Sequence, residues 1–159
     1  MGKRSTARRL AMQVMYQLEL NPSEEISEVL DHTMENDSFP EDTNSFALAL
    51  VRGAWEHRLD ADELIKKRSI GWALERINMI DRSILRLSIY ELKHTDTPQS
   101  VIINEAVNLA KRYGTEDSSR FINGILGGLV DEQNSGKVPR AAARDEQVVS
   151  GKEDPIKEA

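Results

Sequence analysis

The 159-residue sequence contains no cysteine. This absence excludes a disulfide framework, a zinc site built on thiolates and a cysteine nucleophile, and it fits a reducing compartment. Histidine is scarce as well, and the three copies, His32, His57 and His94, lie far apart in the sequence. None has a second ligand at the spacing of a metal site, so neither a metal nor another cofactor is expected.

Long apolar runs are also missing. The basic residues near the N-terminus are followed by an apolar stretch that Gln13, Gln17 and Glu19 interrupt, which is not the pattern of a secretory signal. No segment approaches the roughly 20 apolar residues that a membrane-spanning helix needs. A cytoplasmic protein without a membrane partner is therefore expected.

Strand and catalytic patterns are absent too. No segment alternates apolar and polar residues between hairpin turns, so strands are not expected. Gly124, Gly127 and Gly128 follow no strand, so they form no phosphate loop, and close helix packing explains them more simply. Asp60 and Asp62 form the densest carboxylate pair, but they lie at an expected helix start, where capping explains them. No catalytic residue is predicted, and an enzyme is not expected.

What the sequence does contain is helical periodicity. Residues 76–92 form a strongly apolar stretch that predicts a central helix, and the turn at 95–98 leads into a second one. A helix from about residue 5 to 20 precedes them, a later one carries Gly53 at an expected close crossing, and the last begins near residue 118. These segments predict an all-α bundle of about seven helices that occupies residues 1–132 as one domain. Residues 133–159 contain little apolar surface and are expected to form a disordered tail.

The apolar positions of two helices define the expected core. They are Ala7, Leu10, Ala11, Val14, Met15 and Leu18 in the first helix, and Ile77, Ile80, Ile84, Leu87 and Leu92 in the central helix.

Charge is unevenly distributed along the chain. The net charge of -6 argues against indiscriminate binding of nucleic acid. The first 18 residues nevertheless hold Lys3, Arg4, Arg8 and Arg9 and no acidic side chain, whereas acidic residues dominate from 23 to 63. Two interpretations remain open for this basic end: a solvated helix start, or a surface that faces an anion.

Two segments could bind nucleic acid. The basic end lies beside Gln13 and Tyr16, so it could neutralise phosphates while an aromatic ring stacks on an unpaired base. The turn from Tyr113 to Phe121 lies close to further basic residues, namely Lys111, Arg112 and Arg120. For Phe121 the spacing favours a core position over a base contact, because this residue begins the apolar stripe of the last helix.

Several segments resemble the NusB family of bacterial transcription antitermination factors. The most specific are Asp81-Arg-Ser-Ile-Leu-Arg-Leu-Ser-Ile-Tyr-Glu-Leu92 and Val101-Ile-Ile-Asn-Glu-Ala-Val-Asn-Leu-Ala-Lys111. Arg120-Phe-Ile-Asn-Gly-Ile-Leu126 is similar to that family's Phe-Val-Asn-Gly-Val-Leu segment. Trp72-Ala-Leu-Glu-Arg76 and Ala11-Met-Gln-Val-Met-Tyr-Gln17 also fit. The resemblance covers about residues 4–130.

The resemblance implies two three-helix subdomains with an additional helix, and a function in antitermination. It implies binding of the boxA segment of nascent RNA together with NusE, a ribosomal small-subunit protein, within the transcription elongation complex, above all during ribosomal RNA transcription. The implied RNA contacts are Lys3, Arg4, Arg8, Arg9, Tyr113, Asp117, Arg120 and Phe121. The implied NusE contacts are Tyr16, Glu75, Asp81 and Arg86. Some members form homodimers, so the resemblance allows a homodimer.

The chain departs from the family near its start, where Ser5 and Thr6 replace part of the usual arginine run. Two other functions compete with antitermination. One is a helical adaptor that binds only protein. The other is a stand-alone relative of the NusB-like domain of ribosomal RNA cytosine methyltransferases, a class whose reaction needs a catalytic cysteine and a methyl-donor domain, neither of which this chain has.

Overall fold

The computed structural model describes residues 2–34, 37–71 and 73–136. Within these ranges it contains seven α-helices, one short 3-10 helix and no strand, which confirms the all-α prediction. The elements are α1 (Lys3–Leu20), α2 (Ile26–Thr33), α3 (Glu41–Glu56), α4 (Arg58–Arg68), η1 (Leu74–Arg76), α5 (Met79–His94), α6 (Gln99–Tyr113) and α7 (Ser118–Asn134).

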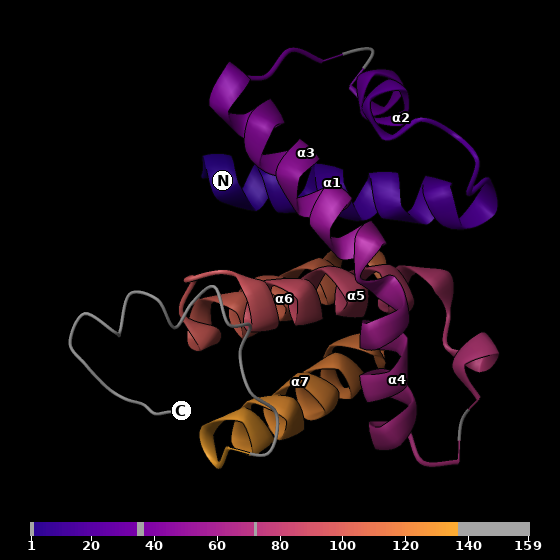
Figure 1. Cartoon of the computed structure of the whole chain (residues 1–159), viewed down its shortest axis with the longest axis vertical. Coiled ribbons are helices and arrows are strands. Elements are labelled where there is room, and N and C mark those ends of the chain that lie inside the picture. The colour runs from indigo at the N-terminus through magenta and orange to yellow at the C-terminus, as the bar shows by residue number, and fades with distance from the viewer. Residues whose placement is uncertain (1, 35–36, 72, 137–159) are drawn as a thin grey trace.

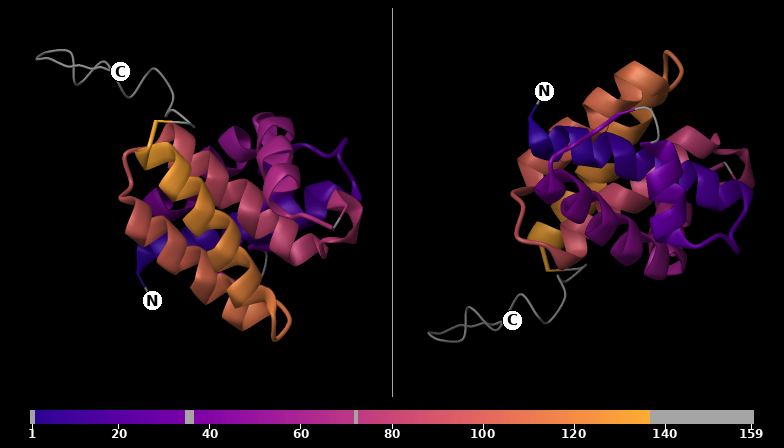
Figure 2. Two further views of the ribbon diagram at one scale, coloured as in Figure 1. Left: turned by 90° about the horizontal axis from the view of Figure 1, so that it is seen from below. Right: turned by 90° about the horizontal axis from the view of Figure 1, so that it is seen from above.

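The helices form two groups of three with α4 alongside (Figure 1). Helices α1, α2 and α3 pack on one another, and α5, α6 and α7 form the second group. In the left view of Figure 2, which is seen from below, α7 lies in front. In the right view, which is seen from above, α1 and α3 lie in front. Helix α4 packs mainly on α5. This arrangement confirms the expected pair of three-helix subdomains with an additional helix.

Helix α5 is the centre of the molecule. Every residue from 81 to 89 is buried, because α5 contacts α1, α3, α4, α6 and α7. The helix begins at Met79 rather than at residue 76, since the Asn78 side chain accepts a hydrogen bond from the Asp81 backbone N–H at 2.9 Å and so caps the helix. Four of the five apolar positions expected for this segment are in the core, and Ile80 is partly buried against it.

The expected stripe of α1 is buried throughout, with Ala7, Ala11 and Val14 fully inaccessible. Gly53 of α3 allows the close crossing that was expected, because a β-carbon at this position would overlap the ring of Tyr90 on α5. The prediction for the α7 glycines holds only for Gly128, which lies against the Arg68 guanidinium. Gly124 and Gly127 have open space where a β-carbon would be, so close packing does not explain them.

The last helix continues two residues beyond the expected end of the domain at residue 132. The Gln133 side chain donates to the Leu92 carbonyl at 3.0 Å and accepts from the Gln99 amide at 2.8 Å. Residues 133 and 134 therefore belong to the folded domain. The rest of the expected tail, residues 137–159, lies outside the described residues.

Candidate functional site

Arg8, expected to contact RNA, lies in the core instead. Its Nε and Nη2 each donate to the Glu91 carboxylate of α5 at 2.8 Å, and the residue is only 5% exposed. Burial alone would lower the pKa of Arg8, but the hydrogen bonds and the charge of Glu91 outweigh it and raise the pKa. Because its guanidinium faces Glu91 rather than solvent, Arg8 has a structural role that contradicts the expected phosphate contact.

The other three residues of the basic end are accessible. Lys3 forms an exposed ion pair with Asp42 at 3.1 Å, an interaction weak enough to exchange for another anion. The Arg4 guanidinium lies 4.3 Å from the centre of the Phe46 ring and has no carboxylate partner among the described residues. Arg9 donates to Gln13 at 3.4 Å. We refer to Lys3, Arg4 and Arg9 as the basic arm.

A hollow with a volume of about 700 Å³ opens beside the basic arm. Its charged lining consists of the cations Lys3, Arg4 and Arg8 and the carboxylates Asp96 and Glu105. Phe46 from α3 and Val101 from α6 supply apolar walls. The Ser5 hydroxyl donates to the Glu105 carboxylate at 2.8 Å and so connects α1 to α6 at this point. We refer to this space as the arm hollow.

Helices α1 and α6 continue side by side beyond the arm hollow. Gln13 and Tyr16 of α1 and Tyr113 at the end of α6 line a second hollow of about 430 Å³. Because α1 rises by about 1.5 Å per residue, Arg4 and Tyr16 are roughly 18 Å apart along its axis. The two helices therefore connect the basic arm to the turn after α6, although the two candidate RNA segments are far apart in the sequence.

The turn between α6 and α7 is held by local contacts. The Ser118 hydroxyl accepts a hydrogen bond from the Thr115 backbone N–H at 2.9 Å. A β-carbon at Gly114 would overlap the Ser118 side chain, so the close approach of α7 requires glycine there. Asp117 at the start of α7 and Arg120 one turn later are both exposed.

The position of Phe121 agrees in part with both interpretations of this residue, a core position and a base contact. The ring packs against the core cluster but is only half-buried. It also lines two hollows, one with Asp117, Arg120 and Arg68, and the other with Asp117 and Asp81. Phe121 can therefore support the core and still offer part of its surface to a ligand.

Asp81 is buried and lines the hollow that also contains Asp117 and Phe121, which has a volume of about 240 Å³. The residue is 5% exposed, and its Oδ1 has no hydrogen-bond partner among the described residues. Burial raises the pKa of Asp81, while Ser118 and Asn78 act in the opposite direction. An expected NusE contact thus lies next to the expected RNA contacts Asp117 and Phe121, not on a separate surface.

The raised pKa of Asp81 makes the stability of the fold depend on pH. The folded state holds this proton more tightly than the unfolded state, so stability falls as pH rises from about 4, the ordinary aspartate value, through the raised pKa. We expect Asp81→Asn to match the parent in acid and to be more stable at neutral pH, as measured by urea denaturation at several pH values. Glu75→Gln, at an exposed carboxylate, is the control. A stability difference between Asp81→Asn and the parent that does not change between pH 4 and 8 would contradict this.

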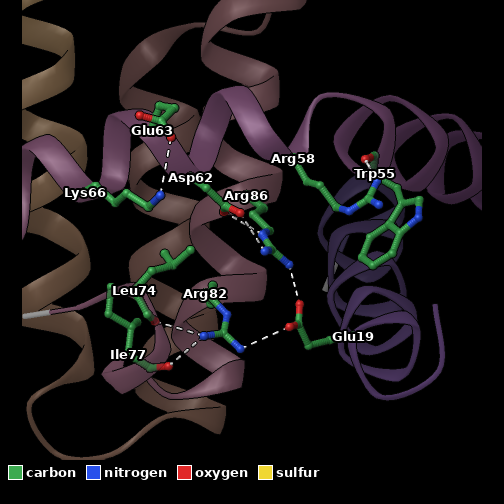
Figure 3. Close-up of polar contacts among 10 residues, drawn as sticks. All are labelled: Glu19, Trp55, Arg58, Asp62, Glu63, Lys66, Leu74, Ile77, Arg82 and Arg86. Carbon is green, nitrogen blue, oxygen red and sulfur yellow. Dashed lines mark hydrogen bonds and ion pairs between the residues drawn. The ribbon is translucent and has the colours of Figure 1, made fainter.

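Arg86, another expected NusE contact, belongs to an internal ion network (Figure 3). Its Nε and Nη2 donate to the two carboxylate oxygens of Asp62 on α4 at 2.8 Å, and its Nη1 donates to Glu19 on α1. Burial would lower the pKa of Arg86, but Asp62 and then Glu19 raise it. With 7% of its surface exposed, Arg86 holds three helices together and directs Nε, Nη1 and Nη2 toward carboxylates inside the protein, which contradicts the expected contact.

Arg82 extends this network toward η1. Its Nη2 donates to Glu19 at 3.2 Å, and its Nη1 donates to the Leu74 carbonyl at 2.9 Å (Figure 3). The network therefore positions η1, where Glu75 is exposed. Of the four expected NusE contacts, Tyr16 and Glu75 are accessible, Asp81 is reached only through its hollow, and Arg86 is internal.

The structure also reveals residues that the sequence reasoning did not assign to the site. Phe46 was not among the candidate residues, yet it lines the arm hollow. His57 and His94 are far apart in the sequence, but the fold stacks their rings with centres 4.3 Å apart. Among the described residues no group of three or more histidine and carboxylate side chains could hold a metal ion. No helix in the same part of the chain is long and apolar enough to cross a bilayer.

Comparison with known proteins identifies relatives of the whole domain. The transcription antitermination protein NusB of Symbiobacterium thermophilum is 44% identical over 135 residues, covering 80% of this chain and 88% of its own length. The NusB protein of Bacillus cereus strain B4264 is 42% identical over 130 residues, covering 81% of this chain and 98% of its own length.

Solved structures of NusB proteins are also similar to this chain. T. maritima NusB is 32% identical with a TM-score of 0.74, covering 91% of this chain and 96% of its own. A complex of NusB and NusE with double-stranded RNA matches with 28% identity and a TM-score of 0.71, covering 81% of this chain and 96% of the matched one. The sequence profile of the NusB family matches residues 5–131. The chain belongs to the NusB family.

Proposed function

We propose that this protein is a transcription antitermination factor that binds single-stranded boxA RNA together with NusE. The observation that carries the proposal is the placement of Arg4 and Arg9 at the surface without carboxylate partners among the described residues, on the helix whose later residues line a hollow with Tyr113. Cations that are not neutralised by the protein can replace the counterions of an RNA backbone. The proposal places the protein in the cytoplasm, in the elongation complex that transcribes ribosomal RNA, and assigns it no reaction.

NusE is the proposed partner because the protein has acidic surface and a buried carboxylate, Asp81, with one oxygen that lacks a hydrogen-bond donor among the described residues. Glu75 is exposed on η1, and Asp81 Oδ1 can accept a hydrogen bond from a cationic side chain that enters its hollow. A basic ribosomal protein offers both charge and donors, so association would be favoured electrostatically. Its positive charge would also extend the short basic arm. Formation of a homodimer stays a prediction from the family.

Two alternatives fit less well. A protein-only adaptor would not need surface arginines without carboxylate partners next to aromatic rings. A domain of a ribosomal RNA methyltransferase is disfavoured because the relatives matched over 88–98% of their length are named antitermination proteins, and because the chain has no cysteine for the methyl transfer.

The basic arm can be tested by titrating a labelled boxA RNA at several salt concentrations. With Arg8 buried, the arm offers three cations, so its share of the logarithmic salt slope should be roughly -2, at about -0.7 per phosphate neutralised on a single strand. We expect the double variant Arg4→Ala/Arg9→Ala to bind more weakly and to have a slope that is shallower by about 1.4.

The matched control is Arg52→Ala/Lys66→Ala, which removes the same charge at exposed positions on α3 and α4. This control should retain most of the affinity and the full slope. Equal losses in the two double variants would mean that net charge, and not the basic arm, determines RNA binding.

A further inference from the structure

The ring of Phe46 is the feature of the arm hollow that phosphate binding does not explain. Phe46 lies on α3 and packs partly against the core, yet part of its surface forms a wall of the hollow. Across from it on α6, Val101 is 40% exposed, one of only four large apolar residues that are exposed among the described ones. A site for phosphate alone would need neither apolar wall.

Two arginines approach the Phe46 ring in different ways. The Arg8 guanidinium lies 5.4 Å from the ring centre and is fixed by its hydrogen bonds to Glu91. The Arg4 guanidinium lies 4.3 Å from the ring centre, is exposed, and has no carboxylate among the described residues to hold it. An exposed cation–π contact contributes only about 0.5–1 kcal/mol. Arg4 can therefore move off the ring at little cost, whereas Arg8 cannot.

We propose that the arm hollow takes one unpaired base of the bound RNA, stacked between the Phe46 ring and the Arg4 guanidinium. This inference rests on the proposed RNA-binding function and adds a base contact to it. Bases stack on both aromatic rings and arginine planes. The volume of about 700 Å³ falls within the range of roughly 300–1,000 Å³ that is usual for small-ligand sites.

Charge favours a base of RNA over a side chain of a protein partner. The lining of the hollow also includes the carboxylates Asp96 and Glu105, but the charged groups at the ring itself are Arg4 and Arg8. These two would repel an arginine or lysine of a protein partner that approached the ring, whereas the phosphates on either side of a base would be attracted to Lys3 and Arg4. The arm hollow lies near the N-terminal end of α1, and Gln13 and Tyr16 further along this helix line the second hollow with Tyr113. A strand held by Lys3 and Arg4 would meet the arm hollow directly, because both residues line it.

The test compares Phe46→Leu with Phe46→Tyr in the titration with boxA RNA and NusE. Leucine keeps apolar bulk against the core but removes the ring, and tyrosine keeps the ring. Stacking contributes about 1–3 kcal/mol per base, so Phe46→Leu should bind roughly 5- to 150-fold more weakly. Because no phosphate contact is lost, the salt slope should stay unchanged. Phe46→Tyr should bind within about twofold of the parent, and circular dichroism should show both variants folded.

A control and a second readout make the result specific. Trp55→Leu removes another aromatic ring covered by an arginine, with Arg58 at 4.0 Å, at the opposite end of α3, and it should not change RNA affinity. An RNA that lacks one base at the stacked position should lose affinity for the parent but not for Phe46→Leu, as a double-mutant cycle requires.

The outcomes separate the base site from RNA binding itself. If the parent binds RNA and Phe46→Leu binds equally tightly, or if the leucine and tyrosine variants lose the same affinity, the base site is wrong and the proposed function stands. If Phe46→Leu weakens NusE binding without RNA and leaves RNA affinity unchanged, the ring is a protein contact and the base site is wrong. If the parent with NusE binds no boxA RNA, both proposals fail.

Discussion

Arg8→Ala is expected to lower the free energy of unfolding by about 3–5 kcal/mol. The variant removes a guanidinium that makes two hydrogen bonds to Glu91 and leaves a carboxylate that is only 2% exposed without its cation. Removing one member of a buried pair is costly because the other stays desolvated and uncompensated. Urea denaturation at neutral pH measures the loss.

Two variants show whether the loss comes from the buried pair. Lys3→Ala removes a basic residue from an ion pair whose side chains are 63% and 66% exposed, and it should cost no more than about 1 kcal/mol. Arg8→Met/Glu91→Leu replaces both charges with apolar groups and should recover much of the stability. If Arg8→Ala is as mild as Lys3→Ala, Arg8 is not paired in solution and returns to the candidate RNA contacts.

Arg86→Ala is expected to have an effect of similar size, about 3–5 kcal/mol. This variant would leave Asp62, 5% exposed, without its guanidinium partner and would leave Glu19 joined to α5 only through Arg82. Because Arg86 connects α1, α4 and α5, we expect both a lower midpoint of thermal unfolding and faster hydrogen exchange in α4, the helix that Arg86 holds through Asp62.

Arg86→Lys distinguishes charge from geometry in this network. Lysine keeps the positive charge but cannot form the two parallel hydrogen bonds to Asp62, so it should recover only part of the loss. Lys66→Ala, which breaks an exposed pair with Glu63 on the same helix α4, should change stability by less than about 1 kcal/mol. Equal stability of Arg86→Ala and the parent would mean that the network does not hold the two helix groups together.

Helical periodicity predicted the fold well because it reports burial directly. The stripe of α1 and the strongly apolar α5 could be predicted since each depends on spacing within one helix. The spacing also indicates that Arg8 of the Arg8–Glu91 pair is buried. Arg8 lies on the apolar side of α1, one turn before Ala11 and two turns before Met15. Glu91 likewise follows Leu87 on the apolar side of α5. A charged residue on the apolar face of each of two helices indicates a buried partner.

The pairing itself could not be predicted, because it joins residues distant in the sequence. Arg8 and Glu91 are 83 positions apart, and Arg86 and Asp62 are 24 apart. The same limit applies to the site. Tyr16 and Tyr113 were assigned to different partners, and only the packing of α1 beside α6 shows that they line one hollow. Phe46 followed the apolar pattern of α3, and no local signal shows that its ring reaches the surface.

The most direct test of the proposed function measures the affinity of boxA RNA for the parent protein with and without NusE at near-physiological salt. Three accessible cations on a chain of net charge -6 should bind the RNA weakly alone, and NusE should extend the positive surface. The account predicts at least a tenfold tighter complex with NusE, about 1.4 kcal/mol, and a steeper salt dependence. Equal affinity with and without NusE, or equal affinity for an RNA with a scrambled boxA sequence, would contradict it.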